Sequence, residues 1–399
     1  MNPLLSRRVQ SIKPSPTLAV TARAAALKAE GRDIIGLGAG EPDFDTPEHI
    51  KQAAIEAIRQ GFTKYTAVDG TPGLKKAVIA KFRRDNALAY TPKQILVSCG
   101  GKQSFYNLAQ AVLDAGDEVV IPAPYWVSYP DMVLLADARP VIVSAGIEQG
   151  FKITPAQLEA AITPRTKLFV INSPSNPTGA VYTKEELAGL GEVLRKHPRV
   201  LIATDDMYEH IRLNDAPFVN ILNACPDLYE RTLVLNGVSK AYSMTGWRIG
   251  YAAGPEAIIQ AMTNIQSQST SNPTSISQVA AEAALNGDQG CMAPMMAAFR
   301  QRHRLVVDGL NAIPGLKCLD AGGAFYAFPD AREAAARMHS TGRIKEATDL
   351  ALTEYLLLEA GVAVVPGSAF GADGYLRLSF ATSNANLENA LARMAKALA

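Results

Sequence analysis

Short apolar runs alternate with amphipathic helix patterns along most of this chain, and this alternation constrains the fold more than any other feature. The runs have the length of strands but no strict apolar–polar alternation, as is typical of strands buried on both faces of a parallel sheet. They cover residues 95–97, 119–121, 168–171, 200–203, 233–235 and 249–252. The pattern predicts an α/β fold in which a mostly parallel sheet lies between helices.

Helix start signals fall between these runs. Thr46-Pro47, Thr71-Pro72 and Thr154-Pro155 each place a capping residue before a proline, which suits the first helical position. After Thr46-Pro47, an apolar face continues to a closing Gly61. Thr183 and Glu186 have the spacing of a capping box, so they predict the start of another helix.

The pattern changes along the chain, which indicates more than one domain. The 399 residues are enough for two or three domains with a large core. We expect residues 46–290 to form a large α/β domain and residues 1–45 and 291–399 to form a smaller α+β domain. The C-terminal part alternates predicted helices and strands, near 295–312, 323–328, 345–359, 362–365, 375–380 and 384–398.

Composition excludes several classes of function. Lys plus Arg (39) nearly balances Asp plus Glu (38), so no nucleic-acid partner is expected. No apolar run is long enough to span a membrane, and the N-terminus lacks the apolar core of a signal peptide, so we expect a cytoplasmic protein. The four cysteines lie far apart without metal-ligand spacing, so neither a disulfide framework nor a metal site is expected.

Unusual polar residues follow four of the predicted strands. The loops contain Gly100-Gly101-Lys102, Asn172 to Gly179 with Asn176, Asp205 to Tyr208, and Ser239-Lys240. Taken singly, a loop lysine is usually a solvated surface group, and an aspartate after a strand is usually a turn or cap residue. Ligands of open α/β sheets bind beyond the carboxyl ends of the strands, so the set predicts a binding site at this edge.

A longer motif includes the last of these loops. Residues 237–250 read GVSKAYSMTGWRIG, which fits at every specified position the cofactor-attachment signature of class I aminotransferases. The chain resembles this family, which has pyridoxal-phosphate (PLP) fold type I, from about Lys13 to Ala381. Further matches are residues 38–44 (GAGEPDF), Lys64-Tyr65, residues 124–126, the Asn-Pro-Thr-Gly loop and Arg377. It is most similar to the bacterial aspartate aminotransferases of subgroup Ib, and residues 8–16 resemble members that also transaminate prephenate.

This resemblance implies the residues that hold the reactive part of the cofactor. Lys240 is expected to carry PLP as a Schiff base, which requires a neutral amine and therefore a lowered pKa, and then to shuttle the Cα proton. Asp205 would face the pyridine nitrogen and keep it protonated. Tyr208 and Asn176 would hydrogen-bond the phenolic oxygen of the ring, and Trp126 would stack on the ring.

The resemblance also implies a phosphate site and a second subunit. The Gly101 and Lys102 N–H groups would bind phosphate at a helix N-terminus, with the Ser239 hydroxyl and the Arg248 guanidinium as further donors. Tyr65 is expected to reach the phosphate of the neighbouring subunit, which implies a homodimer.

Six residues are assigned to the substrate. Arg377 matches the arginine that binds the α-carboxylate, and Gly40 lies in a segment that closes over the substrate. Trp126 and Asn176 are expected to contact the substrate as well as the cofactor. Lys102 is our candidate for the second carboxylate of dicarboxylic substrates, with the cofactor phosphate as the alternative partner of its side chain. Lys13 is a candidate for binding prephenate, and the alternative interpretation is an ordinary surface lysine.

Three other classes of protein are alternatives to a PLP-dependent aminotransferase. A nicotinamide oxidoreductase is suggested only by Gly36-Leu-Gly38-Ala-Gly40, but Glu41 and Pro42 follow, so the dinucleotide fingerprint is incomplete. A regulatory protein on this fold would not need Lys240, Asp205 and Arg377 together. A PLP-dependent lyase stays open, as does an aromatic or other amino acid aminotransferase, because the sequence does not rank aspartate, glutamate, aromatic amino acids and prephenate as substrates.

Overall fold

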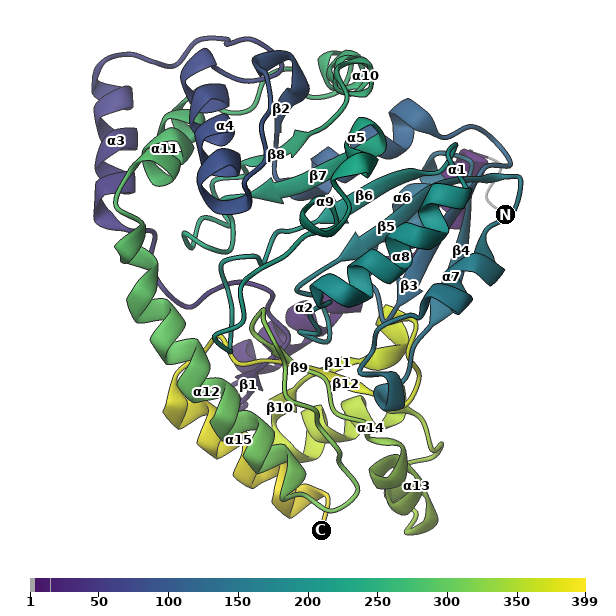
Figure 1. Cartoon of the computed structure of the whole chain (residues 1–399). Coiled ribbons are helices and arrows are strands. Elements are labelled where there is room, and N and C mark those ends of the chain that lie inside the picture. Colours follow the sequence, from purple (N-terminus) through teal and green to yellow (C-terminus); the bar gives the residue numbers. More distant parts are fainter. Residues whose placement is uncertain (1–3, 15) are drawn as a thin grey trace.

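A seven-stranded sheet forms the centre of the computed structural model, which describes residues 4–14 and 16–399 (Figure 1). Strand β8 is antiparallel to both of its neighbours, and the other adjacent pairs are parallel. The predicted α/β class with a mostly parallel sheet is therefore confirmed. The order is β2 (Ile95–Ser98), β8 (Gly250–Ala253), β7 (Thr232–Gly237), β6 (Leu201–Asp205), β5 (Thr166–Asn172), β3 (Glu118–Ala123) and β4 (Arg139–Ser144).

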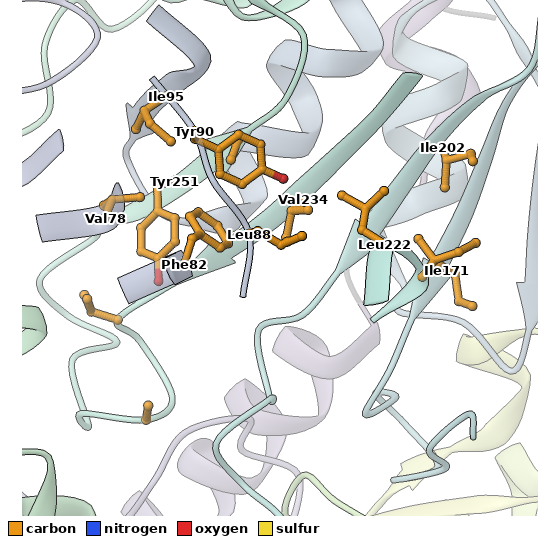
Figure 2. Close-up of a cluster of buried hydrophobic side chains, with 14 of the residues drawn as sticks. Val78, Phe82, Leu88, Tyr90, Ile95, Ile171, Ile202, Leu222, Val234 and Tyr251 are labelled. Atoms are coloured by element: carbon orange, nitrogen blue, oxygen red, sulfur yellow. The ribbon is translucent and has the colours of Figure 1, made fainter. Parts of the chain in front are cut away.

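Helices cover both faces of this sheet, because alternate strand residues are buried on opposite sides. Phe169, Ile171 and Val234 pack in one cluster with α4 (Pro72–Asn86), α8 (Lys184–Lys196) and α11 (Ser275–Asn286) (Figure 2). Leu168 and Val170 pack in a second cluster with α5 (Gly101–Val112), α6 (Ser128–Leu135) and α10 (Glu256–Ser267). This two-sided burial explains why the strands read as continuous apolar runs.

The edge strand β4 was missed by the sequence analysis. It begins with Arg139-Pro140, and its residues are mostly exposed or half-buried, so it lacks a fully apolar pattern. The run Val141-Ile142-Val143 was the available signal. An edge strand covered on one side only is harder to recognise than a central one.

Three of the four helix starts are confirmed. Thr71 and Thr154 accept hydrogen bonds from the N–H groups of Leu74 and Gln157, and Thr183 forms its capping box with Glu186. The prediction for Thr46 is wrong, because Pro47 is the N-cap of α3 (Glu48–Arg59).

The Thr46 side chain instead forms hydrogen bonds with a loop that is distant in the sequence. Its hydroxyl donates to the Ser243 carbonyl at 2.7 Å and accepts from the Trp247 indole at 3.0 Å. The side chain therefore ties the start of α3 to the segment that follows Lys240.

The C-terminal part has its own apolar core. Helix α12 (Ala293–Asn311) lies beside α15 (Asn384–Ala397), and both contribute to this cluster (Figure 1). The other elements are α13 (Arg332–Ser340), α14 (Asp349–Tyr355), β9 (Tyr326–Ala327), β10 (Val362–Ala363), β11 (Val365–Pro366) and β12 (Leu376–Ser379).

The N-terminal segment joins this part. Strand β1 (Ile35–Gly36) pairs in parallel with β10, and α2 (Pro16–Ala29) packs on β10 and β11. The domain limits at residues 46 and 290 stay a prediction. Within the described residues, no helix combines the length and apolarity needed to cross a membrane.

Candidate active site

A cavity of about 250 Å³ lies at the carboxyl ends of the parallel strands. The loops after β2, β5, β6 and β7 all reach it, together with residues of the C-terminal part. The lining residues are Thr17, Gly40, Gly101, Lys102, Trp126, Asn172, Asn176, Asp205, Met207, Tyr208, Ser239, Lys240, Arg248, Tyr326 and Arg377. The structure thus brings together every predicted site residue except Tyr65 and Lys13.

Lys240 lies in the loop after β7. Its Nζ donates a hydrogen bond to the Gly40 carbonyl at 2.7 Å. Burial, reinforced by the positive charges of Arg248 and Arg377, lowers the pKa of Lys240 to about 8. A substantial fraction of this amine is therefore neutral near pH 8, as a nucleophilic lysine requires.

Asp205 ends strand β6 and presents a carboxylate in the same cavity. Oδ2 accepts a hydrogen bond from the Tyr129 hydroxyl, and Oδ1 accepts one from the Met207 N–H at 3.2 Å. Burial raises the pKa of Asp205, although both hydrogen bonds oppose that effect. A fixed carboxylate of this kind can pair with a protonated ring nitrogen.

Arg377, on β12, is a buried cation without an acidic partner among the described residues. Nη1 donates to Asn176 Oδ1 at 3.0 Å and Nη2 to the Gly38 carbonyl at 2.7 Å, while Nε has no hydrogen-bond partner. The guanidinium lies 4.6 Å from the ring centre of Tyr326. Because an uncompensated buried charge is costly, this arrangement indicates a site for an anionic ligand group.

Tyr208 and Tyr326 connect the two parts of the cavity. Their hydroxyl groups lie 2.9 Å apart, and Tyr208 belongs to the loop after β6 while Tyr326 belongs to β9. Burial raises the pKa of Tyr208 well above its ordinary value, so this phenol stays protonated and can donate a hydrogen bond.

Glycines and Arg248 form a concave site at the start of α5. Gly100 has φ 87°, and a Cβ there would lie 2.3 Å from Arg248 Nη2. A Cβ on Gly250 would lie 2.3 Å from the Gly101 nitrogen. Arg248 itself has φ 57°, a strained value for a residue other than glycine. The free N–H groups of the first helical turn, with this guanidinium, could hold a phosphate.

Lys102 and Trp126 line the outer part of the cavity. The Lys102 ammonium lies 5.2 Å from the ring centre of Trp126. Burial and the charge of Arg248 lower the pKa of Lys102, whereas Asp131 opposes the shift. The Lys13 backbone N–H donates to the Asp131 carboxylate, so Lys13 lies beside the cavity without lining it.

Tyr65 does not line the cavity. Its side chain is 91% exposed, and Phe62 nearby is 40% exposed. Its role toward a neighbouring subunit stays a prediction.

The family model described as "Aminotransferase class I and II" matches residues 32–394. The chain belongs to this family. It is thus an aminotransferase. The fold, the class of activity and the family predicted from the sequence are confirmed.

Named relatives agree with this assignment. An aspartate/prephenate aminotransferase of Nitrosomonas europaea is 67% identical over 99% of both chains. One of Cereibacter sphaeroides is 58% identical over 98% of this chain and 97% of its own. The crystal structure of the Rhizobium meliloti aspartate aminotransferase superposes with a TM-score of 0.94, at 51% identity, covering 99% of this chain and 98% of that one. The Thermus thermophilus aspartate aminotransferase with maleate gives a TM-score of 0.92 at 46% identity, covering 98% and 99%.

Several residues that line this aminotransferase cavity or contact its lining were missed by the sequence analysis. Asn172 donates to the Asp205 carbonyl at 2.9 Å and accepts from the Asn176 N–H at 2.8 Å, so it joins the loops after β5 and β6. Its position directly after a predicted strand was the available signal. Tyr129 and Tyr326 carry no comparable signal, because their chemistry depends on helix and strand packing.

Proposed function

We propose that this aminotransferase binds PLP at Lys240 and transfers the amino group of aspartate or glutamate to a 2-oxo acid, with prephenate as a further acceptor. The observation that carries this proposal is the buried Arg377, which lacks an acidic partner among the described residues and shares a cavity with a lysine of lowered pKa. An amino acid supplies both a carboxylate for the arginine and an amine for transfer. The names of the relatives support the choice of substrates.

The cavity fits PLP in charge and shape. The first turn of α5, Ser239 and Arg248 offer donors for a phosphate, and the absence of a Cβ on Gly100 and Gly250 lets Arg248 and β8 lie close to the start of α5. Asp205 offers a carboxylate for the ring nitrogen, while Tyr208 and Asn176 offer donors for the phenolic oxygen. When bound, PLP supplies an electron sink for the charge that develops at the substrate Cα.

The residues of the chain then have separate tasks in transfer. Lys240 Nζ, whose pKa burial lowers to about 8, would serve as the base that takes the proton from the substrate Cα and as the acid that gives a proton back. Asp205, whose carboxylate accepts from Tyr129 and the Met207 N–H, would pair with the ring nitrogen and favour its protonated form. Trp126, which lines the cavity, would cover one face of the ring and keep water from it.

The substrate is held at two ends. Arg377 binds the α-carboxylate, with Asn176 fixing the guanidinium at 3.0 Å. Lys102 would bind the second carboxylate of a dicarboxylic substrate, and Lys13, whose backbone N–H donates to Asp131, would serve prephenate. Gly40, whose carbonyl accepts from Lys240, lies in the segment expected to close over the substrate.

A homodimer and a cytoplasmic location complete the proposal. The exposed Tyr65, with Phe62, Ile55 and Ile58, gives α3 and the following loop an apolar surface suited to a second subunit. Tyr65 would then reach the phosphate in the cavity of the partner.

Single half-reactions with purified holoenzyme test the proposal. Each amino donor is added alone, and the absorbance of the cofactor is followed. Aspartate and glutamate should convert the aldehyde form to the amine form, and 2-oxoglutarate, oxaloacetate or prephenate should reverse it. Release of ammonia without the amine form would identify a lyase and overturn the proposal.

A further inference from the structure

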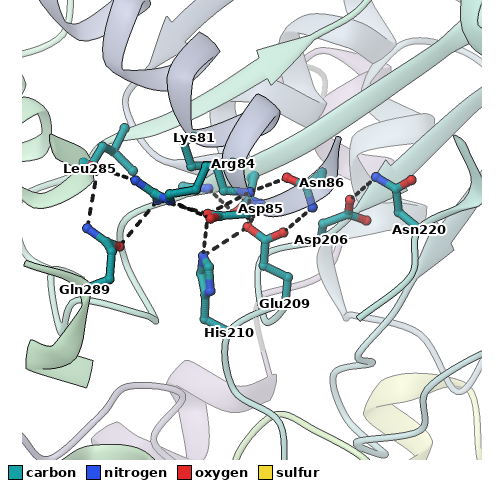
Figure 3. A network of polar contacts seen from close by, with 12 residues as sticks. Lys81, Arg84, Asp85, Asn86, Asp206, Glu209, His210, Asn220, Leu285 and Gln289 are labelled. Atoms are coloured by element: carbon teal, nitrogen blue, oxygen red, sulfur yellow. Dashed lines mark hydrogen bonds and ion pairs between the residues drawn. The ribbon is translucent and has the colours of Figure 1, made fainter. Parts of the chain in front are cut away.

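A buried polar network, outside the cavity, joins the two loops that carry the reactive side chains. Its centre is Glu209, which follows Tyr208 and is 3% exposed (Figure 3). Its Oε1 accepts from Asn236 Nδ2 at 2.8 Å, and its Oε2 accepts from Asn86 Nδ2 at 2.7 Å. Lys81, which is 1% exposed, forms an ion pair with the same carboxylate.

The donors to Glu209 come from different parts of the fold. Lys81 and Asn86 belong to α4, whereas Asn236 lies at the end of β7 and fixes the next peptide through Gly237 N–H at 2.7 Å. Lys240 follows four residues after Asn236, and Asp205 precedes Glu209 by four. One carboxylate therefore connects the loop that contains Asp205 and Tyr208 with the loop that contains Lys240.

Lys81, Asn86 and Asn236 all bind the Glu209 carboxylate. Burial raises the pKa of Glu209, but Lys81, His210 and Asn86 outweigh that effect, so the pKa is lower than usual and the carboxylate is charged. Asp85, Glu209 and His210 lie close enough to hold a metal ion, but Lys81 already compensates the Glu209 charge. No cation is needed there.

Stability alone does not account for such a pair. A buried ion pair can often be replaced by apolar side chains at little cost, whereas removing one partner leaves an uncompensated charge. Fixing two loops relative to each other is a task that directional hydrogen bonds perform and apolar side chains do not.

We propose that Glu209, neutralised by Lys81, is a positioning residue that fixes Asp205 and Tyr208 relative to Lys240. This inference rests on the proposed binding of PLP in the cavity. Loss of the hydrogen bond to Asn236 lets the two loops shift, so the ring contacts and the lysine no longer fit the cofactor together.

Two charge-neutral double variants separate positioning from stability. In Glu209→Gln with Lys81→Met, the amide can still accept from Asn236 and donate to Asn86 Oδ1, which Lys81 has vacated. In Glu209→Leu with Lys81→Met, both hydrogen bonds are lost although no charge is left unpaired. The matched control is Glu118→Gln. Glu118 is a buried carboxylate at the start of β3, away from the cavity at the carboxyl ends of the strands, and it accepts hydrogen bonds from Thr163 at 2.6 Å and Arg165 at 2.7 Å.

The readouts are the Tm of the apoenzyme, the Kd for PLP and the pH titration of the bound cofactor's absorbance. The Leu/Met variant should bind PLP about tenfold more weakly, as expected for one hydrogen bond to a charged group, and shift the titration. The Gln/Met variant should stay near wild type in both. Glu118→Gln should lower Tm and leave PLP affinity unchanged.

The inference is overturned if the Glu209→Leu, Lys81→Met variant keeps wild-type PLP affinity and an unshifted titration. It is also overturned if Glu118→Gln, at the same Tm as that variant, loses as much PLP affinity. If the Leu/Met variant does not fold, Asn236→Ala removes the same hydrogen bond, leaves the Glu209–Lys81 pair intact and provides the comparison with Glu118→Gln. Failure of the wild type to bind PLP would instead refute the proposed function.

Discussion

At the residue scale, Arg377 is a charge whose counter-ion the fold does not supply. Its pKa is lowered by burial, and its partners are a carbonyl, an amide and two aromatic rings. Natural proteins keep such a group where a ligand compensates it.

Arg377→Ala should therefore lose activity without losing the fold. Removing one partner of a desolvated charge pair costs roughly 2–5 kcal/mol, or about 30-fold to several thousand-fold in kcat/KM. All amino donors share the α-carboxylate, so the loss should be similar for aspartate and for neutral donors. A loss confined to aspartate would contradict this role.

Lys102→Ser tests the second carboxylate. A charge-assisted contact contributes roughly 1.5–3 kcal/mol, so kcat/KM for aspartate and glutamate should fall about 10- to 150-fold. Alanine and phenylalanine should be nearly unaffected. If all donors decline together and PLP dissociates more readily, the side chain belongs to the phosphate site instead.

Much of the site could be predicted from the sequence, because several of its residues follow recognisable strands closely along the chain. Lys240, Asp205 and Asn176 lie in the loops that follow apolar runs, so the edge of the sheet to which they belong follows from the sequence. Tyr129 and Tyr326 could not be assigned, because their contacts with Asp205 and Tyr208 join residues 76 and 118 positions apart. Such contacts depend on tertiary packing.

At the element scale, the N-terminal segment is attached beside the cavity. Helix α1 (Arg7–Ser11) packs on α6, Arg8 lies 3.8 Å from Asp137, and the Lys13 N–H donates to Asp131. Helix α2 then places Thr17 in the cavity wall. This segment can therefore influence the shape of the substrate site.

Lys13→Ala should lower prephenate turnover more than aspartate turnover, because the resemblance of residues 8–16 to enzymes that transaminate prephenate assigns this lysine to the bulkier acidic substrate. The comparison needs kcat/KM for both substrates in the same preparation. Equal effects on the two, or a wild type inactive with prephenate, would remove the assignment.

The elements themselves were predictable where apolar pattern and capping agree. Strands β2, β3, β5, β6, β7 and β8 follow from burial on both faces, and Thr71 and Thr154 cap helices as their spacing indicates. The exceptions are β4, which is an edge strand, and Thr46, whose side chain serves a loop almost 200 residues away. A tertiary contact outweighed the local signal in the second case.

At the scale of the whole molecule, Asp206 links stability to pH. This carboxylate is buried, and burial together with the charge of Glu209 raises its pKa from 3.8 to about 7. The folded state then holds a proton that the unfolded state releases. Its stabilising effect is complete below about pH 4 and is lost as pH rises to about 7, at up to about 1.4 kcal/mol per pH unit.

Asp206→Asn should flatten this dependence. Asn220 Nδ2 and the Thr204 hydroxyl now donate to the carboxylate at 3.0 and 2.7 Å, and the amide of the variant can still accept from Asn220 and can donate to the Thr204 oxygen. Urea unfolding of the apoenzyme from pH 5 to pH 8 measures the effect. Parallel curves for wild type and variant would show that Asp206 does not titrate in this range.

The central claim is that Lys240 carries the cofactor, and borohydride reduction of the holoenzyme followed by peptide mapping tests it most directly. Reduction should fix PLP to Lys240 in the wild type. Lys240→Ala should still bind PLP through the phosphate and ring contacts, yet fix none at this position and lose several orders of magnitude in half-reaction rate. PLP fixed to Lys102 or to any other lysine of the wild type would contradict the account.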